Sequence, residues 1–196
     1  MDDMVRKQTS RISRLRVPDE SEIDESIRPI IEQNKRQNGY LENWIVSLAL
    51  NPATLSRCVA YFESLFDPRK GHLPIAEREL IAVVVSAENG CAYCETHHTK
   101  GLAHALKDPI RARRIALGHD HVPDLSPRER AIADLAVKIT RDPSAVTDTD
   151  IDDLRELGFE DHEILEVIET IAFFNYTNRV AITINNIPED RLFILD

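Results

Sequence analysis

Residues 91–98 read Cys-Ala-Tyr-Cys-Glu-Thr-His-His, with two thiols three positions apart and a histidine four positions after the second thiol. On a helix, positions i, i+3 and i+7 share one face, so Cys91, Cys94 and His98 are expected to converge. The preceding pair Asn89-Gly90 is a helix breaker, which predicts that Cys91 opens a new helix. A thiolate at a helix N-terminus is stabilised by the positive end of the helix dipole. The stretch therefore indicates a redox-active dithiol on a helix.

The rest of the sequence also has the pattern of helices. Three of them begin with a capping residue followed by proline, at Asn51-Pro52, Asp108-Pro109 and Ser126-Pro127. The apolar run 80–85 has the propensity of a strand, but its charged lead-in, residues 76–79, favours a buried helix. We therefore predict an all-α fold with helices over residues 24–36, 40–50, 52–66, 74–88, 91–106, 108–118, 127–141, 147–157 and 161–183.

A short internal similarity links residues 73–82 to residues 125–133. Both segments contain a turn, a Glu-Arg pair and then an apolar helix, and only the first leads into cysteines. This indicates two related helical units with the chemistry kept in one of them. We predict a flexible N-terminal tail over residues 1–11 and a single all-helical domain over residues 12–196.

Composition excludes several classes of function. The net charge of −10 at pH 7 argues against nucleic acid as a partner, because nothing would offset phosphate repulsion. No apolar run approaches the roughly 20 residues of a membrane span, and residues 1–10 lack the apolar segment of a secretory signal. We expect a cytoplasmic protein without a membrane partner. In that reducing compartment a close pair of cysteines indicates redox or metal chemistry rather than a structural disulfide.

A dithiol can reduce a peroxide if a base and an acid stand beside it. One thiolate attacks the peroxide and becomes a sulfenic acid, which then condenses with the neighbouring thiol. His98 lies one turn after Cys94 and can hydrogen-bond to its sulfur. If the chain reverses at Asn89-Gly90, Glu79 returns alongside the dithiol, and a carboxylate in an apolar helix needs a partner. Glu79 is therefore a candidate proton relay.

Two other interpretations compete with the redox one. Zinc could be held by the same two thiols and histidine, with His97 or Glu79 as a fourth ligand. Structural zinc sites draw a second pair of ligands from elsewhere, however, and the remaining cysteine, Cys58, stands alone on an apolar helix. We expect Cys58 to be a buried core thiol and assign neither a metal nor a cofactor. The third interpretation is that the thiols and the histidine are packing residues.

The order Glu79, Cys91, Cys94, His98 resembles the alkylhydroperoxidase D / carboxymuconolactone decarboxylase superfamily. The similarity is strongest to the branch labelled peroxidase-related. It is carried by residues 79–87 and 89–94, and by Phe-Phe-Asn-Tyr-Thr-Asn-Arg at residues 173–179. It extends over nearly the whole chain from Ile12 onward.

This resemblance implies the all-helical AhpD-like fold and a homo-oligomer. It also implies that Cys94 is the peroxide-reactive thiol, that Cys91 resolves it, and that Glu79 and His98 relay protons. In the best-understood members a lipoyl group regenerates the dithiol, and a histidine stands between the two cysteines where this chain has Tyr93. The decarboxylase side of the superfamily lacks the cysteine pair, so the two thiols here argue against that chemistry.

We therefore predict an alkylhydroperoxidase-type, peroxiredoxin-like antioxidant enzyme that reduces hydroperoxides with a thiol or lipoyl-type reductant. The alternative, which Tyr93 motivates, is a dithiol–disulfide oxidoreductase or redox sensor with little peroxidase activity. The helix over residues 161–183 is apolar around much of its circumference, so either a neighbouring subunit or the rest of its own chain must cover it. The tail over residues 188–196 is interpreted as an arm that packs on a neighbouring subunit.

Overall fold

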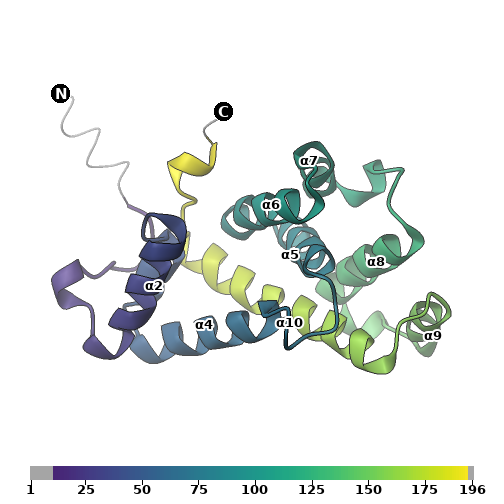
Figure 1. Ribbon diagram of the computed structural model, residues 1–196, viewed down its shortest axis with the longest axis horizontal. Coiled ribbons are helices and arrows are strands. Elements are labelled where there is room, and N and C mark those ends of the chain that lie inside the picture. The colour runs from purple at the N-terminus through teal and green to yellow at the C-terminus, as the bar shows by residue number, and fades with distance from the viewer. Residues whose placement is uncertain (1–10, 194–196) are drawn as a thin grey trace. The chain divides into compact units, whose positions relative to one another are not determined.

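The computed structural model describes residues 11–193, and every regular element in that range is a helix. Short 3₁₀ turns accompany the α-helices, which Figure 1 shows. Apart from Arg11, the predicted N-terminal tail lies outside the described residues. The all-α prediction is confirmed. The helices are α2 (Arg28–Asn38), α3 (Asn43–Leu48), α4 (Pro52–Phe66), α5 (Ile75–Asn89), α6 (Ala92–Leu106), α7 (Pro109–Leu117), α8 (Pro127–Arg141), α9 (Asp148–Glu156) and α10 (Asp161–Ile184).

The local signals for helix ends act as the sequence predicts. Gly39 and Gly90 end α2 and α5 in the left-handed conformation, with φ of 75° and 67°. Ser126 caps α8, because its side chain accepts a hydrogen bond from the Glu129 N–H. Helix α2 begins later than predicted, because Glu25–Ile27 form a 3₁₀ turn before it. Turn residues thus set most boundaries to within a few positions.

The chain divides into two compact units, and residues 11–62 together with 181–193 form the first. Within this unit Ser47 donates a hydrogen bond to Asn186 Oδ1 (2.9 Å), and Asn43 Nδ2 donates to the Ile187 carbonyl (2.8 Å). The Arg191 guanidinium lies 4.1 Å from the centre of the Tyr40 ring. The described part of the C-terminal tail therefore packs on its own chain, where the sequence had suggested an arm for a neighbouring subunit.

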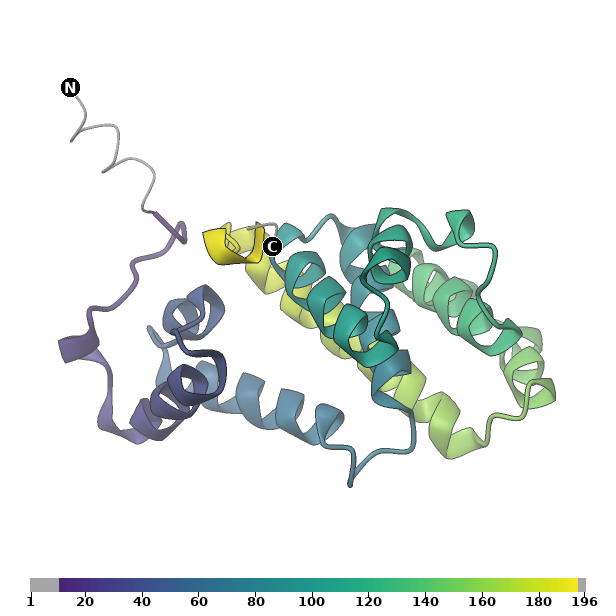
Figure 2. The same cartoon turned by 45° about the horizontal axis from the view of Figure 1, so that its top comes forward.

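The second unit covers residues 63–180 and has α5 at its centre. Helix α5 packs against α6, α7 and α8, and Figure 2 shows α6 running alongside it. The apolar run 80–85 is a buried helical segment, as predicted, with every residue at most 3% exposed. The two similar sequence segments each lead into a helix of 15 residues, α5 and α8, and these two helices pack on each other.

The sequence left open whether a neighbouring subunit or the rest of its own chain covers the apolar surface of α10. In the structure its own chain covers most of it. Its apolar residues Ile164, Val167, Ile171, Phe173 and Phe174 are all at most 4% exposed, whereas Leu165 is 65% exposed. Among the described residues, no helix has the length and apolar character needed to cross a membrane.

Candidate active site

The reversal between α5 and α6 places the predicted site in the second unit. Gly90 ends α5, and the Cys91 N–H donates to the Ser86 carbonyl (2.8 Å) across the turn. Cys91 is the N-cap residue of α6, and Cys94 and His98 follow on that helix. The prediction that the glycine turn lets Cys91 open a new helix is confirmed.

Glu79 returns alongside the dithiol helix and binds His98. Its Oε2 lies 2.8 Å from His98 Nδ1, and the two side chains are 12% and 16% exposed. A carboxylate on one imidazole nitrogen sets the orientation of the ring and decides which nitrogen carries the proton. The two predicted relay residues therefore form a pair, although nineteen positions separate them in the chain.

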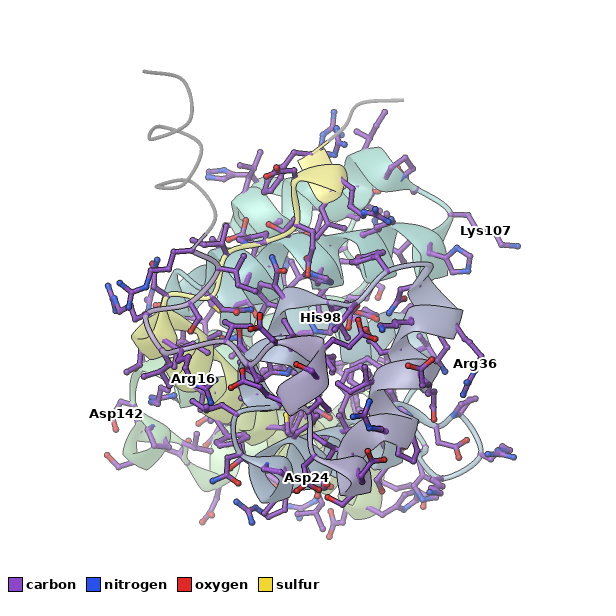
Figure 3. The ribbon with its side chains drawn as sticks, turned by 90° about the vertical axis from the view of Figure 1, so that its left-hand side faces the viewer. Arg16, Asp24, Arg36, His98, Lys107 and Asp142 are labelled. Carbon is purple, nitrogen blue, oxygen red and sulfur yellow. The ribbon has the colours of Figure 1, made fainter. Side chains whose placement is uncertain are left out.

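Aromatic rings and a glycine hold this pair in place. The Phe174 ring meets the His98 ring edge to face at 4.6 Å, and the Phe66 ring is 6.0 Å from it. Gly101 lies against the Glu79 carboxylate, since a Cβ at this position would stand 2.6 Å from Glu79 Cδ. In Figure 3, the Lys107 side chain projects outward from the end of α6.

The two thiols are buried, and their electrostatic surroundings are unequal. The Cys94 thiol donates a hydrogen bond to the Cys91 sulfur. This hydrogen bond is the largest of the effects that lower the pKa of Cys91 to about 7. The N–H groups of Cys94 and Tyr93 and the charge of His98 act in the same direction, and burial opposes them. The same hydrogen bond, together with burial, raises the pKa of Cys94 well above its usual value. Cys91 is therefore the thiol that ionises first.

Helix α10 contributes two polar partners of Cys94 that the sequence reasoning missed. The polar side chains of Asn178 and Thr177 act on the Cys94 sulfur and partly offset the rise of the Cys94 pKa. Asn178 is completely buried, and Thr177 is 5% exposed. Both belong to the Phe-Phe-Asn-Tyr-Thr-Asn-Arg segment, to which no role was given. Polar residues within an apolar helix were the available signal, because buried polar groups need hydrogen-bond partners.

The geometry favours thiol chemistry over a zinc site at the dithiol. Among the described residues, the ligand atoms of Cys91, Cys94 and His98 do not all come within 4.8 Å of one another. His98 Nδ1 is bound to Glu79 instead. The His97 ring stacks on the Tyr93 ring, with the ring centres 4.4 Å apart.

Two further groups lie outside this arrangement. Cys58 is a buried thiol, as predicted, and burial raises its pKa to about 11. His119 Nε2 lies 2.8 Å from Asp134 Oδ1 and 3.7 Å from Asp120 Oδ1. His119 is not part of the dithiol motif, and the two carboxylates that it meets are mostly exposed.

Known proteins share this arrangement of helices. The sequence model of the carboxymuconolactone decarboxylase family matches residues 52–118, which contain both thiols, Glu79 and His98. The uncharacterized protein YdfG of Bacillus subtilis is 33% identical over 112 residues, which are 56% of this chain and 74% of YdfG.

Two solved structures extend the similarity to nearly the full length. An AhpD-core, uncharacterized peroxidase-related protein from Ralstonia eutropha JMP134 superposes with a TM-score of 0.88 at 34% identity, over 94% of this chain and 96% of that protein. An uncharacterized peroxidase-related protein from Silicibacter sp. TM1040 has a TM-score of 0.86 at 28% identity, over 93% and 95% of the two chains.

The fold and these relatives define a class, the AhpD-like all-helical proteins. The chain belongs to the alkylhydroperoxidase D / carboxymuconolactone decarboxylase superfamily, and within it to the peroxidase-related branch.

Proposed function

We propose that this protein is a thiol-dependent peroxidase that reduces hydroperoxides through a Cys91–Cys94 disulfide. One observation carries the proposal: the dithiol and a buried Glu79–His98 pair occur together at this site. The two sulfurs of the dithiol share one proton. Membership in the peroxidase-related branch agrees with this chemistry. We assign peroxide attack to Cys94, resolution to Cys91, and proton transfer to Glu79 and His98.

The first step begins with the proton of the dithiol. It moves from Cys94 to Cys91 along their hydrogen bond, which leaves a thiolate on Cys94. This thiolate attacks the terminal oxygen of the hydroperoxide, so an S–O bond forms while the O–O bond breaks. The departing alkoxide takes a proton and leaves as an alcohol, and Cys94 becomes a sulfenic acid. In this scheme His98, oriented by Glu79, supplies the proton.

The second step returns the site to a neutral disulfide. Cys91 holds the proton that it received in the first step, and it gives this proton to His98, which lost its own to the alkoxide. The resulting Cys91 thiolate attacks the Cys94 sulfur, an S–S bond forms, and the S–O bond breaks with loss of hydroxide. The hydroxide takes a proton and leaves as water. The low pKa of Cys91 suits it to this attack, because the thiolate is the nucleophile. One hydroperoxide and two thiols thus yield an alcohol, water and a disulfide.

The direct test is peroxide consumption by the reduced protein, with cumene hydroperoxide as substrate and dihydrolipoamide as reductant. We expect turnover in the wild type, its loss in Cys94→Ser and Cys91→Ser, and its retention in the control Cys58→Ala, which removes the buried thiol of α4. A sulfenic acid trapped on Cys94 in the Cys91→Ser variant, with a dimedone probe, would support the order of attack.

The alternative activity gives a different result in the same assay. A wild-type protein that consumes no peroxide, while Cys91 and Cys94 still cycle between dithiol and disulfide with lipoamide, would be a dithiol–disulfide oxidoreductase. Tyr93 motivates this alternative. It stands where the best-understood members have a histidine, and a phenol with an ordinary pKa near 10 is a poor base.

We also propose a thiol or lipoyl-type reductant and a homo-oligomeric assembly. The site is reduced only by a partner that can exchange thiols with the Cys91–Cys94 disulfide, and dihydrolipoamide is the simplest dithiol of that kind. Exposed apolar side chains such as Leu165 (65% exposed) and Leu117 (82% exposed) support contacts between subunits. Light scattering coupled to size exclusion tests the assembly, and a mass equal to a single chain would contradict it.

A further inference from the structure

Side-chain amides tie the turn between α5 and α6 to α10. Asn89 is the last residue of α5, and its Nδ2 donates to Asn175 Oδ1 (3.1 Å) and to Asn178 Oδ1 (3.0 Å). Asn178 Nδ2 donates in turn to Ser86 Oγ (3.1 Å), three positions before Asn89 on α5. The Asn178 amide therefore holds the last turn of α5 at two points.

The orientation of these amides follows from Arg179. A guanidinium can only donate, so the Asn175 atom that accepts from Arg179 (2.7 Å) must be oxygen. Asn89 then presents its nitrogen to this oxygen, and the same nitrogen meets Asn178, whose facing atom must be oxygen as well. At the other end of its amide, Asn175 Nδ2 donates to Thr140 Oγ1 of α8 (3.0 Å). A flip of any of these amides would lose hydrogen bonds.

The backbone of the same turn places Cys91. The Cys91 N–H donates to the Ser86 carbonyl (2.8 Å), and Gly90, between Asn89 and Cys91, turns the chain with a φ of 67°. Cys91 is the N-cap residue of α6 and lies three positions before Cys94. Helix ends fray, because their last backbone groups lack partners within the helix. The position of Cys91 beside Cys94 therefore depends on how firmly the end of α5 is held.

We propose that Asn89 is a positioning residue that holds Cys91 in place for its attack on the Cys94 sulfur. The inference rests on the proposed function for its catalytic meaning, since resolution of the sulfenic acid is assigned to Cys91. Fixing the backbone of a residue costs free energy, and the Asn89 hydrogen bonds offset this cost when the protein folds. The dithiol then closes to a disulfide without ordering the turn, which raises the effective concentration of Cys91 at Cys94.

Burial strengthens the connection to α10. Asn178 and Ser86 are completely buried, so water does not compete for the hydrogen bond between them. Loss of the Asn89 amide would take a partner from the buried Asn178 Oδ1, which is unfavourable in the interior. The native arrangement of the turn is therefore favoured over one in which Asn89 swings away from α10.

The test measures how readily the disulfide closes, without peroxide. The protein is equilibrated with mixtures of reduced and oxidised glutathione, and its dithiol and disulfide forms are quantified by acid quenching, alkylation and mass spectrometry of the peptide that contains both cysteines. Each closure consumes one oxidised glutathione and releases two reduced ones. We expect Asn89→Ala to lower the equilibrium constant for closure about tenfold, because the released turn must be ordered as the disulfide forms.

The matched control is Thr140→Val, which removes the hydrogen bond at the other end of the Asn175 amide. It should lower the free energy of unfolding in urea without a comparable change in the equilibrium constant for closure. An unchanged constant in Asn89→Ala, or a change no larger than that of Thr140→Val, would overturn the inference.

A second variant covers the case in which Asn89→Ala does not fold. Asn175→Ala removes one of the two α10 acceptors and leaves Asn89 in place, so the equilibrium constant should fall by a smaller factor. In that case a constant equal to that of the wild type or of Thr140→Val would refute the role of Asn89. Because no peroxide is used, absent peroxidase turnover would refute the proposed function and leave this measurement unaffected.

Discussion

At the scale of single residues, the site depends on polar groups that find partners inside the protein. A buried carboxylate is unfavourable unless it is paired, and Glu79 has His98 at 2.8 Å. The two thiols also partner each other, and this makes them unequal, because the thiol that donates the hydrogen bond keeps its proton and the other loses it. The two resulting predictions concern the charge of the dithiol and the position of Glu79.

The dithiol should lose its first proton near neutral pH. The Cys94 hydrogen bond and the N–H groups at the start of α6 lower the pKa of Cys91 to about 7, so thiolate absorbance at 240 nm should rise around that pH. The midpoint belongs to the coupled pair, and the titration near pH 7 should disappear in Cys91→Ser. A first midpoint at the ordinary thiol value of about 8.5 in the wild type would contradict this account.

Gly101→Ala should impair catalysis through Glu79. The added methyl would stand 2.6 Å from Glu79 Cδ, so the carboxylate at the end of its flexible side chain must move away from His98. We expect kcat/KM for cumene hydroperoxide to fall at least about tenfold, with little change in Tm because alanine favours the helix.

A double-mutant comparison separates this mechanism from a general disturbance of α6. In a Glu79→Ala background the clash is absent, so the Gly101→Ala substitution should cause no further loss of kcat/KM. Equal losses in both backgrounds would show that Gly101 acts in some other way.

At the scale of elements, the position of the dithiol depends on how α5 ends. Gly90 has a φ of 67°, which allows the chain to turn back within one residue and makes Cys91 the N-cap of α6. Asn178 and Asn175 of α10 then connect to the same turn through Asn89. A short motif of two thiols therefore depends on three helices for its geometry.

Gly90→Ala and Gly158→Ala form a matched pair at this scale. Both glycines have positive φ (67° and 88°), and at neither would a Cβ meet another atom within 4 Å. Each substitution should lower the free energy of unfolding by about 1 kcal/mol through backbone strain alone. Only Gly90→Ala should also shift the first titration midpoint of the dithiol, because Gly158 lies at the end of α9, away from the site. Urea unfolding and thiolate absorbance measure the two effects, and an equal shift of the midpoint in both variants would contradict the assignment.

At the scale of the whole molecule, acidic side chains dominate the surface, and many of them are paired. Lys138 and the Thr147 cap lower the pKa of Asp150 to about 2, and Arg111 is among the partners that lower the pKa of Glu129. Each of these carboxyls has a lower pKa in the folded state than in the unfolded state. It stabilises the folded state at pH values above its unfolded pKa, and this stabilisation is lost as the pH falls through its folded pKa. The groups lowered in this way include Glu20, Glu22, Asp24, Asp142, Asp161 and Glu163.

The protein should therefore unfold progressively in acid. We expect Tm to be nearly constant between pH 7 and about 5, and to fall steadily as pH drops from about 4.5 towards 2. The Asp150 carboxyl stabilises the fold at neutral pH and loses this effect in acid. Asp150→Asn should therefore lower Tm at neutral pH and make the fall of Tm in acid less steep. Differential scanning fluorimetry across this range checks both statements, and a Tm that rises towards low pH would contradict them.

The sequence by itself determined the all-helical class, most helix boundaries and the residues of the dithiol motif. These features depend on local rules, because glycine and proline act within one turn and helical spacing alone brings Cys91, Cys94 and His98 to one face. Only the tertiary structure decided that Glu79 binds His98, that Gly101 adjoins its carboxylate, and that Asn178 of α10 reaches Cys94. These contacts join residues that are 19, 22 and 84 positions apart in the chain. A hydrogen bond across such a distance depends on how helices pack, and spacing within one chain does not encode that directly.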